Sequence, residues 1–374
     1  MHYMVARAGF KGPCTDGTQR SAKDRMARAA RRANQGVNIQ AVAERAGVSA
    51  MTVSNVVSGR RKVREATRDA VLAAVEALGY VPNIAAQALA SAGTVRLGLL
   101  CSTTESAFLS SILVGVLDAT TALGAQLLLR RVPVNRSDEI VAEIVALAAS
   151  GVSAILIAPP YCEAISRSGF VHETTVPLMA MSPGDALPNM RSVGIDDFAA
   201  ARDMTRYLIG LGHRRVGFIR AAETHIISHT RQAGYRAALE EAGLGWSRDL
   251  AAYGDLSFES GLVAAEYLLD LPERPTAIFA SNDDMAAAVV SLAHRRAIRV
   301  PEDLSVVGFD DSPIAVKIWP PLTTMRQPIA RIAARAATLV IQGLRARGDD
   351  ASVAVTAEYL PYELVEREST ARLG

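Results

Sequence analysis

The chain has 374 residues, of which 50% are hydrophobic and 21% are charged, so it can bury a sizeable core divided over two or three domains. Its longest apolar runs, 95–101 and 152–158 among them, fall well short of the ~20 residues that span a bilayer, which excludes a transmembrane helix. Residues 1–92 contain fourteen Lys and Arg and six Asp and Glu, a net charge of +8, whereas the rest contains 26 and 32, a net charge of −6, so only the N-terminal quarter suits a polyanion such as nucleic acid.

Residues 1–36 are predicted to form a basic, disordered extension, because Gly, Arg, Ala and Lys dominate and apolar periodicity is weak. Charges and glycines interrupt the stretch where a secretory signal would be continuous and apolar, so we expect a cytoplasmic location. Cys14, Cys101 and Cys162 are odd in number and widely spaced. They indicate neither a disulfide framework nor a zinc site, and no metal or cofactor is expected.

Three short helices are predicted within residues 37–81, at 39–46, 50–57 and about 65–78. Gly47 stops the first of them. Ser49 can cap the second, and Gly79 has the position and residue type that end the third. Such a group of three helices, with a short turn between the first two, is typical of a helix-turn-helix DNA-binding domain.

Residues 82–93 are predicted to be a hinge, because this alanine-rich piece is too short and too weakly apolar to be a stable helix by itself in water. From residue 94 to residue 374, strand-like runs alternate with amphipathic helices, which predicts parallel sheets. The runs are 95–100, 125–130, 154–158, 177–181, 214–219, 276–280 and 304–309. This length exceeds one doubly wound domain, so we expect two Rossmann-like lobes around a cleft, with the chain crossing between them near 211 and 326.

Residues 37–90, VNIQAVAERAGVSAMTVSNVVSGRRKVREATRDAVLAAVEALGYVPNIAAQALA, closely resemble the DNA-binding headpiece of the LacI/purine-repressor family. Residues 94–366 resemble the effector-binding core of that family, through VGIDDFAAARDMTRYLIGLGHRRVGFI, RQAGYRAALEEAG, AIFASNDDMAAAVV and VPEDLSVVGFDDSPIAVKIWPPLTTMRQP. The resemblance implies an all-α helix-turn-helix headpiece followed by an α/β, two-lobed core like the periplasmic binding proteins. It also implies a bacterial repressor, a homodimer or higher oligomer, that binds a pseudo-palindromic operator and responds allosterically to a small metabolite.

The second predicted helix is identified as the one that reads bases. A helix opened at Ser49 turns Ala50, Met51 and Asn55 away from its apolar face and toward the major groove. Asn55 can donate to and accept from an adenine edge, whereas Ala50 and Met51 offer only apolar contact, for example to a thymine methyl group. The family often has Arg or Lys where this chain has Asn55, and a helix-capping residue where it has Arg64, so the operator sequence stays open.

Two further sets of DNA contacts follow from the resemblance. The residues expected to bind phosphates and fix the register are Asn38, Gln40, Ser49 and Thr52. Ser49 and Thr52 can instead serve only to cap and pack the helix. The hinge residues that match the minor-groove segment of the family are Asn83, Ala86 and Leu89. Leu89 is the expected apolar wedge between base pairs, with packing against the core as the alternative.

Four residues match effector contacts of the family: Phe108 in the first lobe, and Arg231, Asn282 and Asp310 in the second. Their types suit a sugar or a related hydroxylated ligand, and less well a purine. The alternative for each is a hydrogen bond or surface role without a ligand.

Three other positions bear on the ligand or the scaffold. Leu256 stands where some sugar-responsive relatives have a stacking aromatic residue. Trp319 can replace that wall or lie in the dimer contact. His213, at the predicted turn into the second lobe, is expected to be scaffold.

Other classes of protein fit less well. The chain has no GxGxxG after a strand and no GxxxxGK[ST], GxSxG or HExxH motif, so we do not expect an enzyme. A periplasmic solute receptor would share the two lobes but would need an export signal and would lack the headpiece. A regulator controlled by a partner protein in place of a metabolite stays open.

Overall fold

The computed structural model describes residues 39–58, 63–78, 80, 95–222, 226–346 and 355–373. The chain divides into two units, Met1–Gly93 and Thr94–Gly374. The predicted extension 1–36 and hinge 82–93 lie outside the described residues. Within the described ranges, no helix has the length and apolar character needed to cross a membrane.

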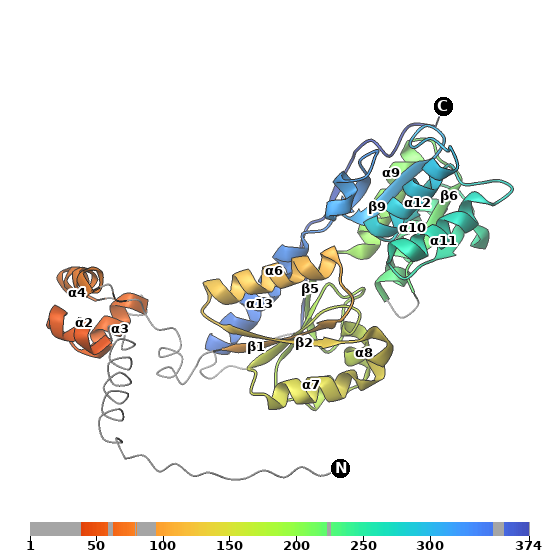
Figure 1. Ribbon diagram of the computed structural model, residues 1–374. Helices are drawn as coiled ribbons and strands as arrows, with labels where there is room; N and C mark the ends of the chain where they lie inside the picture. Colours follow the sequence, from red (N-terminus) through yellow and green to blue (C-terminus); the bar gives the residue numbers. More distant parts are fainter. Residues whose placement is uncertain are drawn as a thin grey trace, which may run out of the picture. The chain divides into compact units, whose positions relative to one another are not determined.

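In its described residues the first unit contains three helices, α2 (Ile39–Ala46), α3 (Ala50–Ser58) and α4 (Glu65–Leu78), shown in Figure 1. Gly47 adopts a positive φ of +67° between α2 and α3, a conformation that glycine reaches without steric cost. The core of this unit is a small apolar cluster at the centre of the three helices, formed by Val42, Ala43, Val53, Val71, Ala74 and Tyr80. The predicted helix-turn-helix arrangement is therefore confirmed.

The first lobe of the second unit is a parallel sheet of six strands in the order β11-β5-β4-β3-β1-β2. Its strands are β1 (Arg96–Ser102), β2 (Gln126–Val132), β3 (Ala154–Ile157), β4 (Leu178–Met181), β5 (Arg191–Gly194) and β11 (Ala357–Tyr359). Two helices, α6 (Ala107–Ala122) and α13 (Ile329–Ala346), cover one face. The other face is covered by α7 (Ile140–Ala149) and α8 (Cys162–Arg167), as Figure 1 shows.

The second lobe repeats this plan with the strand order β12-β10-β9-β8-β6-β7, in which only the pairing of β12 with β10 is antiparallel. Its strands are β6 (Val216–Arg220), β7 (Ala251–Tyr253), β8 (Ala277–Ala280), β9 (Ser305–Asp310), β10 (Thr323–Arg326) and β12 (Glu363–Val365). Two helices, α9 (Asp197–Gly210) and α10 (Ile226–Glu241), pack on one face. The other face carries α11 (Phe258–Leu269) and α12 (Asp283–Arg295).

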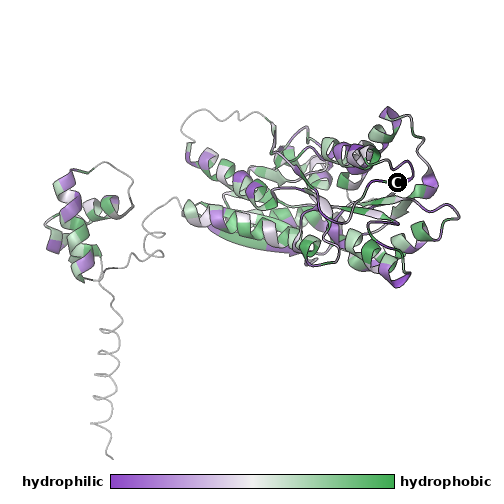
Figure 2. Ribbon diagram, turned by 90° about the horizontal axis from the view of Figure 1, so that it is seen from above, coloured by the Kyte–Doolittle hydropathy of each residue, from purple (hydrophilic) through white to green (hydrophobic). Residues whose placement is uncertain are grey.

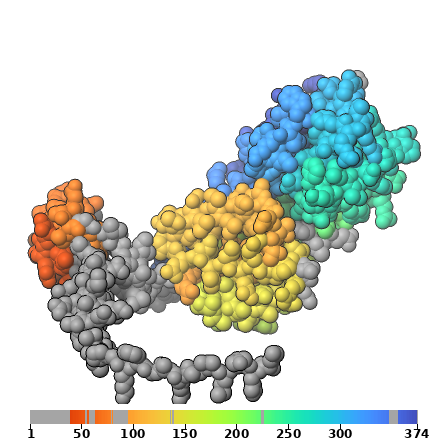
Figure 3. Space-filling model, viewed as in Figure 1, coloured from red at the N-terminus to blue at the C-terminus, as the bar shows by residue number. Residues whose placement is uncertain are grey.

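Hydrophobic side chains follow the strands and the helix faces that cover them, as Figure 2 shows, so each sheet is buried on both faces as a parallel sheet requires. In Figure 3 the two lobes form separate bulges, one mainly yellow and one green to blue. Short 3-10 helices complete the described elements at Val134–Glu139, Phe170–His172, Arg248–Leu250 and Pro313–Val316.

The chain crosses between the lobes three times. The first crossing is at 195–196, because β5 pairs in the first sheet whereas the next helix, α9, packs against α10 of the second lobe. The expected crossing near 211 is therefore wrong, and residues around His213 lie inside the second lobe. The chain returns to the first lobe at 327–328, between β10 and α13. The third crossing, at 360–362 between β11 and β12, was not predicted from the sequence.

Small residues allow the close helix contacts on both lobes. A Cβ atom on Gly115 of α6 would lie 2.1 Å from the Ala330 carbonyl oxygen of α13. A Cβ atom on Gly234 of α10 would lie 2.2 Å from the Phe198 carbonyl oxygen of α9. Because real Cβ atoms do not approach so closely, only glycine permits either helix pair to pack at this distance.

Candidate ligand pocket and DNA-binding surface

A cavity of about 630 Å³ lies between the two lobes of the second unit. First-lobe residues from the loop after β1, the start of α6 and the segment after β3 line one side. Second-lobe residues that follow β7, β8 and β9 line the other, at the carboxyl ends of the strands, where open α/β sheets bind ligands. All four predicted effector residues line this cavity: Phe108, Arg231, Asn282 and Asp310.

Arg231, on α10, is almost completely buried and is held by the protein. Its Nε donates to Asp197 Oδ1 at 2.8 Å, its Nη1 donates to the Ser281 carbonyl oxygen, and its Cζ lies 3.5 Å from the centre of the Phe309 ring. Its Nη2 lies 3.9 Å from Asp310 Oδ1. Burial raises the pKa of Asp197, and the Arg231 charge opposes this rise. The side chain is thus fixed in one orientation beside the pocket.

Asn282 and Asp310 also have partners within the protein. Asn282 Oδ1 accepts a hydrogen bond from the Met285 backbone N–H at 3.0 Å and caps α12, and its Nδ2 donates to the Leu256 carbonyl oxygen at 2.8 Å. Asp310 Oδ1 accepts from Gln327 Nε2 at 2.6 Å. The structure thus contains the hydrogen bonds that were the alternative to a ligand role for these two residues. Each side chain still has donor or acceptor capacity that these bonds leave unused.

Gln327 lies in the crossing at 327–328, so its bond to Asp310 connects the pocket with the segment that joins the lobes. Asp310 itself has a positive φ of +110°, which is rare for a residue with a side chain. Burial raises its pKa to about 6, an effect that the Arg231 charge reduces. A ligand that contacts Asp310 would therefore act directly on a hydrogen bond to the first residue of the segment that leads from the second lobe to the first.

Another buried carboxyl group belongs to Asp283, which does not line the pocket. Asp283, the first residue of α12, accepts hydrogen bonds from Thr324 Oγ1 and from the Ser312 backbone N–H, each at 2.6 Å. A Cβ atom on Gly308 would lie 2.3 Å from Asp283 Oδ1, so glycine makes room for this carboxyl. Burial, reinforced by the nearby charge of Asp310, raises the pKa of Asp283 to about 8.

The apolar walls of the pocket are partly those expected. Phe108 and Leu256 line it, and Phe258, which the sequence analysis did not single out, provides a second aromatic ring. Trp319 is 73% exposed and does not line the cavity, so it does not replace the missing aromatic wall. His213 is buried and bonds through its ring nitrogens to Thr276, Ser305 and the Ala371 carbonyl oxygen, in keeping with a scaffold role.

Four acidic residues that no sequence pattern singled out line the same pocket: Glu105, Asp255, Glu259 and Asp284. All four lie within two residues of a helix N-cap, which is Ser106, Ser257 or Asn282. A Ser or Asn at the start of an amphipathic stretch, directly after a strand, was the available signal.

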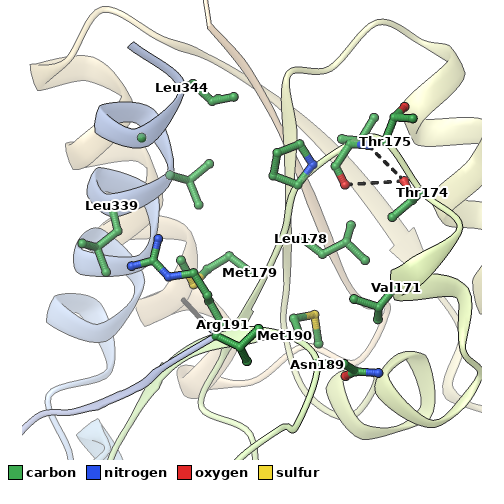
Figure 4. Close-up of a pocket in the computed structure, with 15 residues that line it drawn as sticks. Val171, Thr174, Thr175, Leu178, Met179, Asn189, Met190, Arg191, Leu339 and Leu344 are labelled. Carbon is green, nitrogen blue, oxygen red and sulfur yellow. Dashed lines mark hydrogen bonds between the residues drawn. The ribbon is translucent and has the colours of Figure 1, made fainter. Parts of the chain in front are cut away.

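The first lobe contains a smaller cavity of about 290 Å³, shown in Figure 4 between α13, the strands β4 and β5 and the segment 171–178. Its lining is mostly aliphatic, and Arg191 is its one charged residue among those described. Thr174 Oγ1 accepts a hydrogen bond from the Val176 N–H at 3.2 Å at its rim. None of the predicted effector residues lines it, so the interlobe cavity is the candidate ligand site.

The predicted DNA-reading helix, α3, exposes some of its candidate residues more than others. Met51 is 71% exposed and Asn55 is partly exposed, whereas Ala50 packs against the apolar cluster. Ser49 Oγ accepts from the Thr52 backbone N–H at 3.1 Å and lies 2.9 Å from Thr52 Oγ1, which is the capping arrangement named as the alternative.

Of the remaining DNA candidates, only Gln40 is described, and it is exposed on α2. The others lie outside the described residues: Asn38, Asn83, Ala86 and Leu89.

A helix-turn-helix unit joined to a two-lobed core with an interlobe cavity defines a class of ligand-responsive DNA-binding proteins. Comparison with known families agrees with this description. Residues 38–83 match the model of bacterial regulatory proteins of the lacI family, and residues 205–370 match a periplasmic binding protein-like domain.

Whole-chain relatives give the same result. The chain is 31% identical over 339 residues to catabolite control protein A of Priestia megaterium, covering 89% of this chain and 99% of that protein. It is 33% identical to the transcriptional repressor PurR of Photorhabdus laumondii, covering 88% and 96%. Among solved structures, the lac repressor dimer bound to operator and the anti-inducer ONPF has a TM-score of 0.72 at 27% identity, covering 90% and 100%.

The chain belongs to the lacI family of bacterial regulatory proteins. It is a DNA-binding transcriptional regulator, and its relatives are regulators and not enzymes. The predicted fold class, a helix-turn-helix headpiece with a periplasmic-binding-protein-like core, is confirmed.

Proposed function

We propose that this regulator is a homodimeric, cytoplasmic repressor, associated with the nucleoid, that releases a pseudo-palindromic operator when a small hydroxylated metabolite fills the interlobe pocket. The observation that carries the proposal is the convergence of Phe108, Arg231, Asn282 and Asp310 on one cavity between the lobes. Convergent polar groups with an aromatic wall are what a ligand site requires. The two-fold symmetry of a dimer would match that of the operator.

We propose that α3 enters the major groove. Asn55 reads a base, Met51 and Ala50 supply apolar contacts, and exposed Gln40 binds a phosphate together with Asn38, Ser49 and Thr52. The exposure of Met51 and the partial exposure of Asn55 support this assignment, whereas the packing of Ala50 makes its contribution the smallest. Asn83, Ala86 and Leu89 are proposed to contact the minor groove, with Leu89 as the wedge.

Dimerisation through the core is supported by exposed apolar side chains. Val114 and Leu117 on α6 of the first lobe, and Val316 and Trp319 of the second, are among the large hydrophobic residues that the described core leaves exposed. Exposed apolar groups of this size are typical of protein interfaces. Of the two roles predicted for Trp319, the dimer contact is the one compatible with its exposure.

A sugar-like effector is favoured over a purine. One solved relative is a complex of the transcriptional regulator CelR with cellobiose, with a TM-score of 0.64 at 30% identity, covering 89% of this chain and 99% of that chain. The pocket of about 630 Å³ is large enough for a mono- or disaccharide, and its many carboxylate and hydroxyl groups suit hydroxyl recognition. Its two phenylalanines leave an apolar wall for the ring face.

The roles of α2 and α3 can be separated with two variants. Asn55→Ala is expected to weaken binding to the cognate operator by ~1–3 kcal/mol and to broaden the base preference at one position of each half-site. Gln40→Ala is the matched control on the neighbouring helix, because loss of a phosphate contact weakens all sequences to a similar extent. Selection from a randomised operator library, followed by titration, measures both effects. An unchanged base preference in Asn55→Ala would exclude Asn55 as a reading residue.

A further inference from the structure

The interlobe pocket carries an excess of negative charge. Among the described residues, its lining contains five carboxylates, Glu105, Asp255, Glu259, Asp284 and Asp310, and a single cationic side chain, Arg231. The Arg231 charge is already matched by its buried ion pair with Asp197, which does not line the cavity. An anionic ligand would therefore enter a pocket in which nearly every unpaired charge repels it.

Helix N-termini explain only part of this excess. The N-caps of α6, α11 and α12, which are Ser106, Ser257 and Asn282, all line the pocket, and the positive end of a helix dipole would by itself attract an anion. An acidic residue at each of these N-termini cancels that attraction. Since each helix end is equivalent to about half a unit charge, five carboxylates exceed what three N-termini neutralise.

Two of the acids, Glu259 and Asp284, form a like-charge pair. They lie in the first turns of α11 and α12, where Glu259 is exposed and Asp284 is half-buried, and within the described residues neither side chain has a hydrogen bond or ion pair. Burial raises the pKa of Asp284, and the charge of Glu259 raises it further. Two carboxylates that repel each other at the wall of a cavity are stabilised when a cation lies between them.

The lining suits an organic cation better than a metal ion. In the described parts of the chain, no group of three or more His, Cys, Asp or Glu side chains is arranged to hold a metal. An ammonium group needs fewer ligands, because it has three N–H donors that two carboxylates and one neighbouring oxygen satisfy. The phenyl rings of Phe108 and Phe258 leave the remainder of the pocket suited to an apolar or hydroxylated ring.

We infer that the effector is an amine-bearing hydroxylated ligand, such as an amino sugar, whose ammonium group binds Glu259 and Asp284, and that phosphorylated and carboxylated analogues are excluded. This inference rests on the proposed function, since it takes the interlobe pocket as the effector site. Beyond the proposed function, the inference specifies that the ligand is positively charged and that Glu259 and Asp284 select it.

The first test needs no ligand. If Glu259 and Asp284 are held in mutual repulsion for a ligand, Asp284→Asn and Glu259→Gln each raise the melting temperature of the unliganded protein by about 1–2 °C, as expected for relief of a small destabilisation. If the two acids serve only the helix dipoles, both substitutions lower it, and the inference is overturned. Glu302→Gln, which removes an exposed acid that precedes β9 and does not line the pocket, is the matched control.

The second test uses matched sugars. Glucosamine, glucose and glucose 6-phosphate, and the same three forms of galactose, are titrated against the full-length protein by thermal shift and calorimetry. We expect an amino member to bind at least about tenfold tighter than its neutral counterpart, the phosphate to bind weakest, and the double variant with Glu259→Gln and Asp284→Asn to lose this preference.

Either of two results overturns the inference: a phosphorylated sugar that binds tighter than the matching amino sugar, or no melting-temperature shift with any amino sugar. A neutral or anionic ligand that still releases operator DNA would leave the proposed function standing and remove only the amine assignment. Loss of the proposed function would instead appear as operator binding that no ligand in the pocket affects.

Discussion

Asp310→Asn is expected to abolish release of operator DNA by the effector while the unliganded protein still binds its operator. Asp310 lines the pocket, and its Oδ1 accepts the hydrogen bond from Gln327 in the crossing between the lobes. A ligand on Asp310 can therefore change the interlobe arrangement, and the coupling between ligand and DNA is expected to be ~1–3 kcal/mol, or about 5–150-fold in operator affinity. The substitution removes the charged acceptor without removing volume.

Asparagine is the appropriate replacement at this position. It is among the residues that tolerate positive φ, as the value of +110° at Asp310 requires, so the backbone of β9 can be retained. Arg231→Ala is a weaker test, because it leaves the buried Asp197 carboxylate unpaired and destabilises the fold, by ~3–5 kcal/mol for a pair of this kind.

Operator titrations with and without the effector found in a thermal-shift screen, on wild type, Asp310→Asn and the control Glu302→Gln, measure the effect. The account predicts effector-dependent release in wild type and Glu302→Gln only. If Asp310→Asn releases DNA at the same effector concentration as wild type, Asp310 is not part of the effector site.

The stability of the core is expected to fall as the pH rises toward 8 and to level off above it, and Asp283→Asn is expected to remove most of this fall. Asp283 has a pKa raised to about 8 by burial, above its ordinary value, so the folded protein keeps a proton that the unfolded chain releases. The stability that this proton provides is complete below the ordinary pKa and is lost as the pH rises through the raised one. A single group of this kind contributes up to about 1.4 kcal/mol per pH unit within that window.

Thermal or urea unfolding at several pH values from 6 to 9 gives the measurement, with Glu302→Gln as the exposed control that should follow wild type. At pH 9, Asp283→Asn should be more stable than wild type, because it buries no charge while an amide can still bond to Thr324 and Ser312. Parallel curves for wild type and Asp283→Asn would show that Asp283 is ionised in the folded protein throughout this range.

The sequence predicted elements well where a local pattern determines them. The apolar face of 39–46, the stop at Gly47 and the cap at Ser49 all belong to segments of a few residues, and α2 and α3 form where these signals lie. Short strands were missed for the opposite reason. β5, β7 and β10 have three or four residues each and lack the continuous run of large apolar residues that marked the equally short β3, β4 and β8, so pairing with neighbours decides that they are strands.

The error at the first crossing has a similar cause. Nothing local to α9 tells which lobe it joins, because its apolar face suits either sheet. The packing of α9 on the second lobe depends on Gly234 of α10, because the absence of a side chain there lets the backbones of α9 and α10 come into contact. This contact joins residues far apart in the sequence, so periodicity cannot reveal it.

The pocket could be predicted in outline only. Arg231, Asn282 and Asp310 were placed at strand ends and helix starts, and parallel sheets bring such positions together. Their partners could not be predicted, since Asp197 lies 34 residues from Arg231 and Gln327 lies 17 residues from Asp310, and only the fold brings each pair together. The acidic lining was overlooked because each acid, taken alone, is an ordinary first-turn residue of a helix, and only the cavity brings their charges together.

The central claim, that this chain is a dimeric repressor controlled by a small ligand, is tested most directly by footprinting the full-length protein on fragments of its own genome, at two salt concentrations, with and without effector. The account predicts a two-fold symmetric protected site, with binding that weakens steeply as salt increases and is lost when effector is added. Protection of a single asymmetric site, or a symmetric site that no effector releases, would contradict it.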